Sequence, residues 1–241
     1  MLERLKRACK SKLDASSVPY NVLAWCYGWI TGRPSIRRAA RTRTCMRLSK
    51  DSRFAEEHLH MASLCPVGIL DAVVDRWHPQ SFLDVGCGTG RAMEYLSRRG
   101  VECLGVEGSA AAIAHSPVKR QIRMANLNQP LNLGRRFDLV WSFEVAEHIH
   151  PKFTETFLNS LASHGDRIVM SAAQPGQGGV GHFNEQPLSY WIQRMSRRGF
   201  VLDAPFTEQL HALADPFSGN MMAFTHSLDP SGTEAASHLR P

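Results

Sequence analysis

Residues 82–90, with the sequence Phe-Leu-Asp-Val-Gly-Cys-Gly-Thr-Gly, carry an apolar run straight into a glycine-rich turn. The apolar run predicts a buried strand over 81–85. The segment after the turn, 91–99, has helical spacing and is followed by Gly100, which is typical of a helix end. A strand, a tight turn and a helix in this order are the first unit of a doubly wound α/β sheet.

The rest of the chain continues the same alternation. Helices are expected at 66–77, 110–115, 151–164 and 187–198, and strands at 101–107, 120–124, 137–143, 167–172, 200–204 and 221–226. This spacing predicts an α/β fold, a doubly wound Rossmann-like sheet of about seven mostly parallel strands. Ligands of such sheets bind at the carboxyl ends of the strands.

Basic residues are concentrated at the beginning of the chain. The first 55 residues contain 13 Lys and Arg against three Asp and Glu, although the whole chain has a formal net charge of only +6. The arginines gather just before the regular pattern begins, at Arg33, Arg37, Arg38, Arg41, Arg43 and Arg47. We therefore expect a basic helical appendage or cap at 1–52, the α/β domain at 53–228 and a disordered tail at 229–241.

The composition, 43% hydrophobic and 21% charged, is ordinary for a soluble globular protein. The six cysteines include no Cys-x-x-Cys pair and no zinc-ligand spacing, so we expect reduced thiols in a cytoplasmic protein. The apolar stretch 18–30 is too short to span a bilayer. It also follows too many charges to be expected as a signal peptide.

Two features separate the glycine-rich turn from a dinucleotide site. Its spacing is Gly-x-Gly-x-Gly, so the Gly-x-Gly-x-x-Gly pyrophosphate fingerprint is absent. Asp84 precedes the turn, where a carboxylate would repel a phosphate but attract the ammonium group of a methionine moiety. Glu107, at the end of the second predicted strand, can accept hydrogen bonds from both hydroxyls of a ribose.

In these residues the chain resembles the class I S-adenosylmethionine-dependent methyltransferases, over residues 60–225. The resemblance implies S-adenosyl-L-methionine as the cofactor, bound by Asp84, Gly86, Cys87, Gly88 and Glu107. The family places an acidic or amide side chain against the adenine after the third strand. Asn126 and Leu127 occupy that place, with Asn126 where many members have Asp.

Polar side chains follow the fourth predicted strand, where this family brings the methyl group to its acceptor. Glu144, Glu147 and His148 are spaced i, i+3 and i+4, so a helical segment would place them on one face. His182 lies in a Gly-rich loop after the fifth strand, which is expected to neighbour the fourth. Such groups can ligate a divalent cation or provide a general base.

This set resembles the Glu-x-x-Glu-His element of two metal-using groups, the small-RNA 3′-terminal ribose methyltransferases and the ubiquinone-biosynthesis O-methyltransferases. The resemblance implies that Mg²⁺ or another divalent cation binds to Glu144, Glu147, His148 and His182. Two other interpretations stay open. His148 or His182 can act as a metal-free base beside Glu144, or the whole set can be structural. The neighbouring Gln174, Asn184 and Gln186 are expected to hold polar groups of the substrate.

The function predicted from these residues is O-methylation of a hydroxyl on a small molecule or glycan. Residues 181–191 also resemble a bacterial methyltransferase subgroup that accompanies glycan or natural-product biosynthesis genes. One alternative is an RNA ribose 2′-O-methyltransferase that binds phosphates through its basic appendage. The same appendage could contact an anionic membrane surface, or it could simply cap the substrate site. An alternative of another class is a cofactor-binding partner subunit that no longer methylates.

Overall fold

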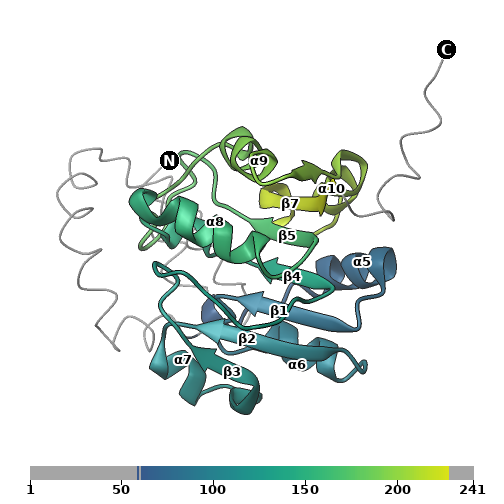
Figure 1. The fold of residues 1–241 in the computed structure, drawn as a ribbon, viewed down its shortest axis with the longest axis vertical. Coiled ribbons are helices and arrows are strands. Elements are labelled where there is room, and N and C mark those ends of the chain that lie inside the picture. Colours follow the sequence, from purple (N-terminus) through teal and green to yellow (C-terminus); the bar gives the residue numbers. More distant parts are fainter. Residues whose placement is uncertain (1–58, 60, 228–241) are drawn as a thin grey trace, which may run out of the picture. The chain divides into compact units, whose positions relative to one another are not determined.

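The computed structural model describes residue 59 and residues 61–227, in which helices cover both faces of one seven-stranded sheet (Figure 1). The strands are β1 (Ser81–Val85), β2 (Glu102–Glu107), β3 (Ile122–Met124), β4 (Leu139–Ser142), β5 (Arg167–Ser171), β6 (Phe200–Leu202) and β7 (Met221–His226). The α-helices are α5 (Val67–Trp77), α6 (Arg91–Ser97), α7 (Ala110–Ala114), α8 (Thr154–Ala162), α9 (Leu188–Ser196) and α10 (Ala204–His211). Short 3₁₀ helices are η1 (Met61–Ser63), η2 (Lys119–Gln121), η3 (Ala146–His148), η4 (Pro151–Phe153) and η5 (Ser218–Asn220).

Several of the sequence predictions concern other parts of the chain. The appendage expected at 1–52, with its arginine cluster, and the tail expected at 229–241 lie outside the described residues. Within the described part, Cys65, Cys87 and Cys103 are free thiols. The helices of this part are all too short or too polar to cross a membrane.

The sheet has the strand order β3-β2-β1-β4-β5-β7-β6. β1 to β5 run parallel to one another, and β7 is antiparallel to both β5 and β6. The predicted Rossmann-like, mostly parallel sheet is therefore confirmed. From β1 the chain first builds outwards through β2 and β3, and then returns to add β4 on the other side of β1. This reversal makes a topological switch point at the carboxyl ends of β1 and β4, where ligands of such sheets bind.

Apolar side chains fill a layer on each face of the sheet. On one face, α5, α6 and α10 bury residues such as Leu70, Met93 and Leu210. On the other face, α8 and α9 bury Phe157 and Trp191. Because β4 lies between the two layers, all four of its residues are buried, as its continuous apolar run predicts. This rigid centre fixes the positions at which β1 and β4 end.

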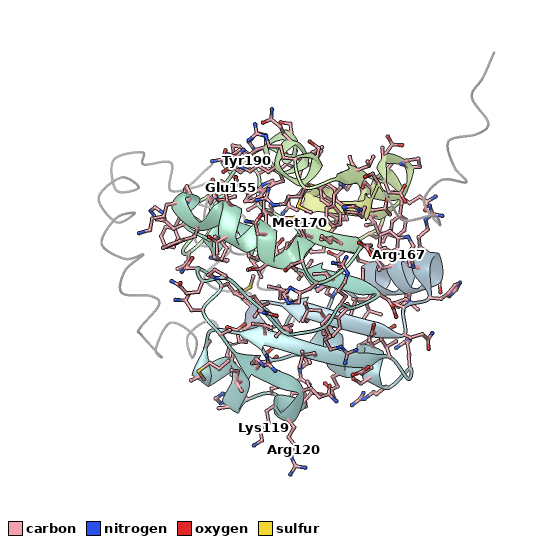
Figure 2. The ribbon with its side chains drawn as sticks, in the orientation of Figure 1. Lys119, Arg120, Glu155, Arg167, Met170 and Tyr190 are labelled. Atoms are coloured by element: carbon pink, nitrogen blue, oxygen red, sulfur yellow. The ribbon has the colours of Figure 1, made fainter. Side chains whose placement is uncertain are left out.

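The structure differs from the expected elements in three places. The strand expected at 200–204 ends at Leu202, because Asp203 caps α10 by accepting the amide hydrogen of Phe206 at 3.1 Å. The helix expected at 151–164 is divided into η4 and α8. The strand expected from residue 120 begins only at Ile122, since Lys119 and Arg120 belong to η2 and point outwards at the edge of the sheet (Figure 2).

Candidate functional site

The glycine-rich turn follows β1 directly and is attached to the end of β2. The amides of Gly86 and Cys87 donate to the carbonyl oxygen of Val106, at 2.8 and 3.1 Å. Gly86 and Gly88 have φ angles of 85° and 54°, in the left-handed region that favours glycine. A β-carbon on Gly86 would overlap the side chain of Val145. The turn therefore lies directly against the segment that follows β4.

Glu107 organises this turn through both of its carboxylate oxygens. Oε2 accepts the amide hydrogen of Gly88 at 2.8 Å, and Oε1 accepts that of Ser109 at 2.7 Å. A carboxylate oxygen has two lone pairs, so each oxygen can accept one further hydrogen bond. The geometry is therefore compatible with the predicted contact between Glu107 and ribose hydroxyls.

Asp84, in β1 just before the turn, is the second acidic residue beside it, and only 3% of its surface is exposed. Burial, together with the nearby charge of Glu107, raises the pKa of Asp84 to about 8. Two acidic groups beside one turn make a site that disfavours phosphate and favours a cation. The ammonium group of S-adenosylmethionine fits this requirement because its positive charge would stabilise both carboxylates.

The remaining predicted cofactor residues are Cys87, in the turn, and Asn126 and Leu127, which follow β3. The Cys87 thiol is buried and lies against Gly105 of β2, and burial raises its pKa well above the usual range. It therefore packs behind the turn and is unsuited to act as a nucleophile. Asn126 and Leu127 follow β3 as expected. The Asn126 side-chain oxygen accepts the amide hydrogen of Asn128 at 3.0 Å, and Leu127 packs against the core.

The segment after β4 is not the helix that the i, i+3, i+4 spacing suggested. Glu144 has a φ of 55°, a left-handed conformation that takes it out of any helix, and η3 comprises only three residues. Glu144 is held by Ser171 at the end of β5. Its amide donates to Ser171 Oγ at 2.6 Å, and the Ser171 hydroxyl donates to Glu144 Oε1 at 2.9 Å. The shared helical face expected for Glu144, Glu147 and His148 is therefore wrong.

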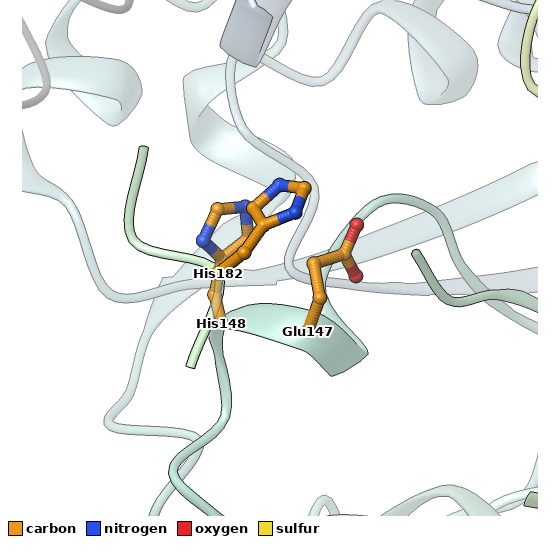
Figure 3. Close-up of side chains that lie close together, drawn as sticks. All are labelled: Glu147, His148 and His182. Atoms are coloured by element: carbon orange, nitrogen blue, oxygen red, sulfur yellow. The ribbon is translucent and has the colours of Figure 1, made fainter. Parts of the chain in front are cut away.

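The structure nevertheless gathers three of the four predicted metal ligands. Potential ligand atoms of Glu147, His148 and His182 all lie within 4.8 Å of one another, above η3 (Figure 3). Glu144 is outside this group. Glu147 is completely buried, and its carboxyl group lies against the carboxyl group of Glu144 and the backbone of Ala173. Burial and the nearby charge of Glu144 raise the pKa of Glu147 well above its ordinary value.

The two histidine rings are held in defined tautomers. His148 Nδ1 lies 3.1 Å from the carbonyl oxygen of Gly181, and His182 Nδ1 lies 3.3 Å from Glu185 Oε1. Both partners can only accept, so each Nδ1 carries a hydrogen, and in the neutral His182 ring Nε2 then carries the lone pair. Burial lowers the pKa of His182, which favours its neutral form. A neutral imidazole is the form that ligates a metal or accepts a proton.

The Gly-rich loop reaches this cluster through its backbone. The amides of Phe183 and Asn184 donate to the carbonyl oxygen of Glu147, at 2.9 and 3.0 Å. Asn184 is 1% exposed and its side chain donates to Thr154 Oγ1 at 3.0 Å. Its expected contact with substrate is therefore wrong, since the side chain is buried in the fold. Gln174 and Gln186 donate to Gly219 and Asn184.

Comparison with known proteins agrees with this geometry. A family model described as a methyltransferase domain matches residues 58–170. The fold is similar to that of a TehB-like S-adenosylmethionine-dependent methyltransferase from Corynebacterium glutamicum. The TM-score is 0.53 at 19% identity, over 74% of this chain and 97% of the other. Residues 58–170 thus match a methyltransferase domain, and the described region has the fold of an S-adenosylmethionine-dependent methyltransferase.

Two curated relatives match parts of this methyltransferase domain. Tocopherol O-methyltransferase of Arabidopsis thaliana is 33% identical over 134 residues, which are 49% of this chain and 35% of that protein. A ubiquinone biosynthesis O-methyltransferase of Brucella ovis is 33% identical over 75 residues, which are 28% of this chain and 30% of that protein. The matched stretches span about a third of the length of each relative.

Sequence reasoning missed three residues of the methyltransferase site. Ser171 ends a predicted strand next to β4, so an inventory of polar residues at strand ends would have found it. Glu185 lies inside the Gly-rich loop, but the sequence does not reveal that it contacts His182. Ala62 contacts Thr89 of the turn through its backbone carbonyl oxygen, so its side chain carries no signal.

Proposed function

We propose that this methyltransferase transfers a methyl group from S-adenosylmethionine to a hydroxyl oxygen of a small molecule or glycan, with the help of a divalent cation. The observation that carries this proposal is the position of the Glu147, His148 and His182 cluster. Val145, two residues before Glu147, packs on Gly86 of the cofactor turn. A group bound at the cluster would therefore lie beside a cofactor bound at the turn.

The protein's part in the reaction is mainly to position the reactants. When bound, S-adenosylmethionine supplies an electrophilic methyl group on a sulfonium. Asp84 would hold its ammonium group and Glu107 its ribose, so the methyl group is presented at the carboxyl ends of β1 and β4. In-line transfer between two aligned partners is accelerated strongly by such positioning.

The cation belongs to the proposal because the cluster suits one chemically. Glu147 is a buried carboxyl group beside that of Glu144, and the charge of a bound cation would stabilise its ionised form. Two imidazole nitrogens and one carboxylate oxygen favour ions such as Mn²⁺, Co²⁺ or Zn²⁺ over Mg²⁺. Such an ion supplies Lewis acidity, which lowers the pKa of a hydroxyl acceptor.

The accepting atom is proposed from the curated relatives. Both are named O-methyltransferases, one for tocopherol and one for ubiquinone biosynthesis, which supports oxygen as the acceptor and a small molecule as the substrate. A glycan, a cytoplasmic location and a contact of the basic 1–52 segment with RNA or membrane are further expectations from the sequence. Salt-dependent RNA binding that disappears when 1–52 is deleted would favour the ribose methyltransferase alternative.

Calorimetry tests whether the cluster binds a divalent cation. Mn²⁺, and separately Mg²⁺, is titrated into protein saturated with S-adenosylhomocysteine. Glu147→Gln removes the buried ligand, and Glu208→Gln, on the exposed side of α10, is the matched control. We expect saturable Mn²⁺ binding that is lost only in Glu147→Gln, together with methylation of hydroxyl compounds in an acceptor panel.

Other outcomes of the same titration are equally informative. Absence of heat at millimolar metal, with methylation retained, would reject the cation and leave a neutral His148 or His182 as the base. Cofactor binding without methylation of any compound in extracts would favour the non-catalytic partner subunit. Methylation confined to amines would reject the hydroxyl acceptor.

A further inference from the structure

Glu185 makes more contacts with the Gly-rich loop than its place near the end of that loop suggests. Its Oε2 accepts the amide hydrogen of Gly176 at 3.0 Å. Its Oε1 accepts that of Gly178 at 2.7 Å. One carboxylate therefore binds two loop amides that lie seven and nine residues earlier in the chain.

The same carboxylate faces His182. Glu185 Oε1 lies 3.3 Å from His182 Nδ1, and only 11% of the Glu185 side chain and 12% of the His182 side chain are exposed. A buried carboxylate beside an imidazole is the arrangement that orients metal-ligating histidines in many proteins. Here the hydrogen on Nδ1 is directed at Glu185, which leaves the lone pair on Nε2.

The loop that Glu185 closes also holds the His182 ring from the other side. A β-carbon on Gly179 would overlap Nε2, Cε1 and Cδ2 of His182 almost equally, so the Gly179 backbone lies over the face of the ring. Any side chain at this position would displace the ring. The position of residues 176–179 and the position of the His182 ring therefore depend on each other, and Glu185 contacts both.

The loop is joined to the candidate metal cluster just beyond His182. The amides of Phe183 and Asn184 donate to the carbonyl oxygen of Glu147, so this backbone is attached to η3 on one side and to Glu185 on the other. Besides the Glu185 contacts, the segment 176–182 is bonded at Gln177, whose amide donates to the carbonyl oxygen of Gln174, and at Gly181, whose carbonyl oxygen faces His148.

We propose that Glu185 is a positioning residue, which holds His182 as its Nδ1–H tautomer and orders the loop 176–179 over the ring. The effect of Glu185 on metal binding rests on the proposed function, whereas its effect on the His182 tautomer and on the loop does not. Glu185 contacts neither cofactor nor substrate in this scheme. It acts through His182.

Nitrogen-15 NMR of the histidine side chains in the full chain measures the tautomer directly. We expect His182 to carry its hydrogen on Nδ1 in the natural protein and to lose this preference in Glu185→Ala. Hydrogen exchange of the Gly176 and Gly178 amides should accelerate in the same variant. Glu185→Gln keeps one acceptor oxygen of similar reach, so it should be intermediate, and Glu208→Gln should change nothing.

Titration of Mn²⁺ alone distinguishes failure of this proposal from failure of the proposed function. Loss of the orienting partner should weaken Mn²⁺ binding by about ten- to a hundredfold while S-adenosylhomocysteine binds unchanged. If the natural protein binds no Mn²⁺, the metal proposal fails, and the tautomer and exchange measurements still decide the role of Glu185. If Glu185→Ala does not fold, Glu185→Gln decides it. An Nε2–H tautomer in the natural protein, or unchanged tautomer and exchange in the folded variants, would overturn the proposal.

Discussion

The backbone amide of Thr89 lies 2.8 Å from the carbonyl oxygen of Ala62, in the short helix η1 that precedes α5. The Thr89 hydroxyl lies 3.2 Å from the same oxygen and 3.0 Å from Ser63 Oγ. Ser63 in turn donates to the carbonyl oxygen of Leu59 at 2.7 Å. A segment that precedes the sheet is thus bonded directly to the cofactor turn.

Replacement of Thr89 by Val should loosen this segment without changing the shape of the residue. Thr89 is 1% exposed, and the variant loses both hydroxyl contacts. We expect the free energy of unfolding, measured by urea denaturation, to fall by about 1–2 kcal/mol. An unchanged unfolding curve would show that the two contacts of the Thr89 hydroxyl contribute no stability.

Gly88→Ala should damage cofactor binding more than any change in the exposed helices. The residue has a φ of 54°, and a β-carbon would overlap the Ala62 carbonyl oxygen. Backbone strain and this overlap should shift the turn, so calorimetry should show that S-adenosylhomocysteine binds at least about tenfold more weakly, or 1.4 kcal/mol.

Gly68→Ala is the matched control for the substitution at Gly88. Gly68 is exposed in α5, and nothing lies within 4 Å of an added β-carbon. This change should leave cofactor affinity unchanged and stabilise the protein by about 0.4–1 kcal/mol, since it reduces the freedom of the unfolded chain. Equal effects of the two substitutions on affinity would contradict the role given to Gly88.

Glu107→Gln tests the acid at the end of β2. The side-chain carboxamide of the variant keeps one acceptor oxygen. The backbone amide of either Gly88 or Ser109 would therefore face its NH₂ group, which is a donor. Hydrogen bonds to a charged group contribute about 1.5–3 kcal/mol, so cofactor affinity should fall by about tenfold or more. Glu102→Gln is the control on the same strand. Its side chain is 64% exposed and paired with Arg135, and its effect should be negligible.

The pKa of Asp84 predicts a pH dependence of stability. Its pKa is raised from 3.8 to about 8 in the folded state, so between these values the folded protein retains a proton that the unfolded chain has lost. The free energy of unfolding of the cofactor-free protein should therefore decrease as pH rises through this window, and the Asp84 contribution should level off above it. Urea denaturation at several pH values measures this slope.

Asp84→Asn isolates that contribution, because Glu147 also has a raised pKa and adds a slope of the same sign. The difference between the natural protein and the variant should grow with pH and become constant above about pH 8. Saturating S-adenosylhomocysteine should reduce the slope, since its ammonium group favours the ionised carboxylate. Parallel curves for the two proteins would show that Asp84 does not titrate in this range.

Local sequence patterns predicted most of the fold because they report on short-range physics. An apolar run, a glycine-rich turn and a helical repeat place β1, the turn and α6 with little ambiguity. The helix α10 is not among the elements expected from the sequence, although Asp203 and Pro205 are ordinary helix-start residues. The strand expected at 200–204 should therefore have stopped at Asp203, which caps α10.

The sequence by itself determined the sheet class, the turn with Asp84 and Glu107, and the identity of the polar residues after β4. Only the tertiary structure decided which of those residues meet. Glu144 leaves the cluster because its φ is positive and Ser171, on the neighbouring strand, holds it. His182 joins the cluster because backbone amides after it bond to the Glu147 carbonyl oxygen. Contacts of this kind depend on strand order and on main-chain hydrogen bonds, which every residue type except proline can donate and which therefore leave little trace in the sequence.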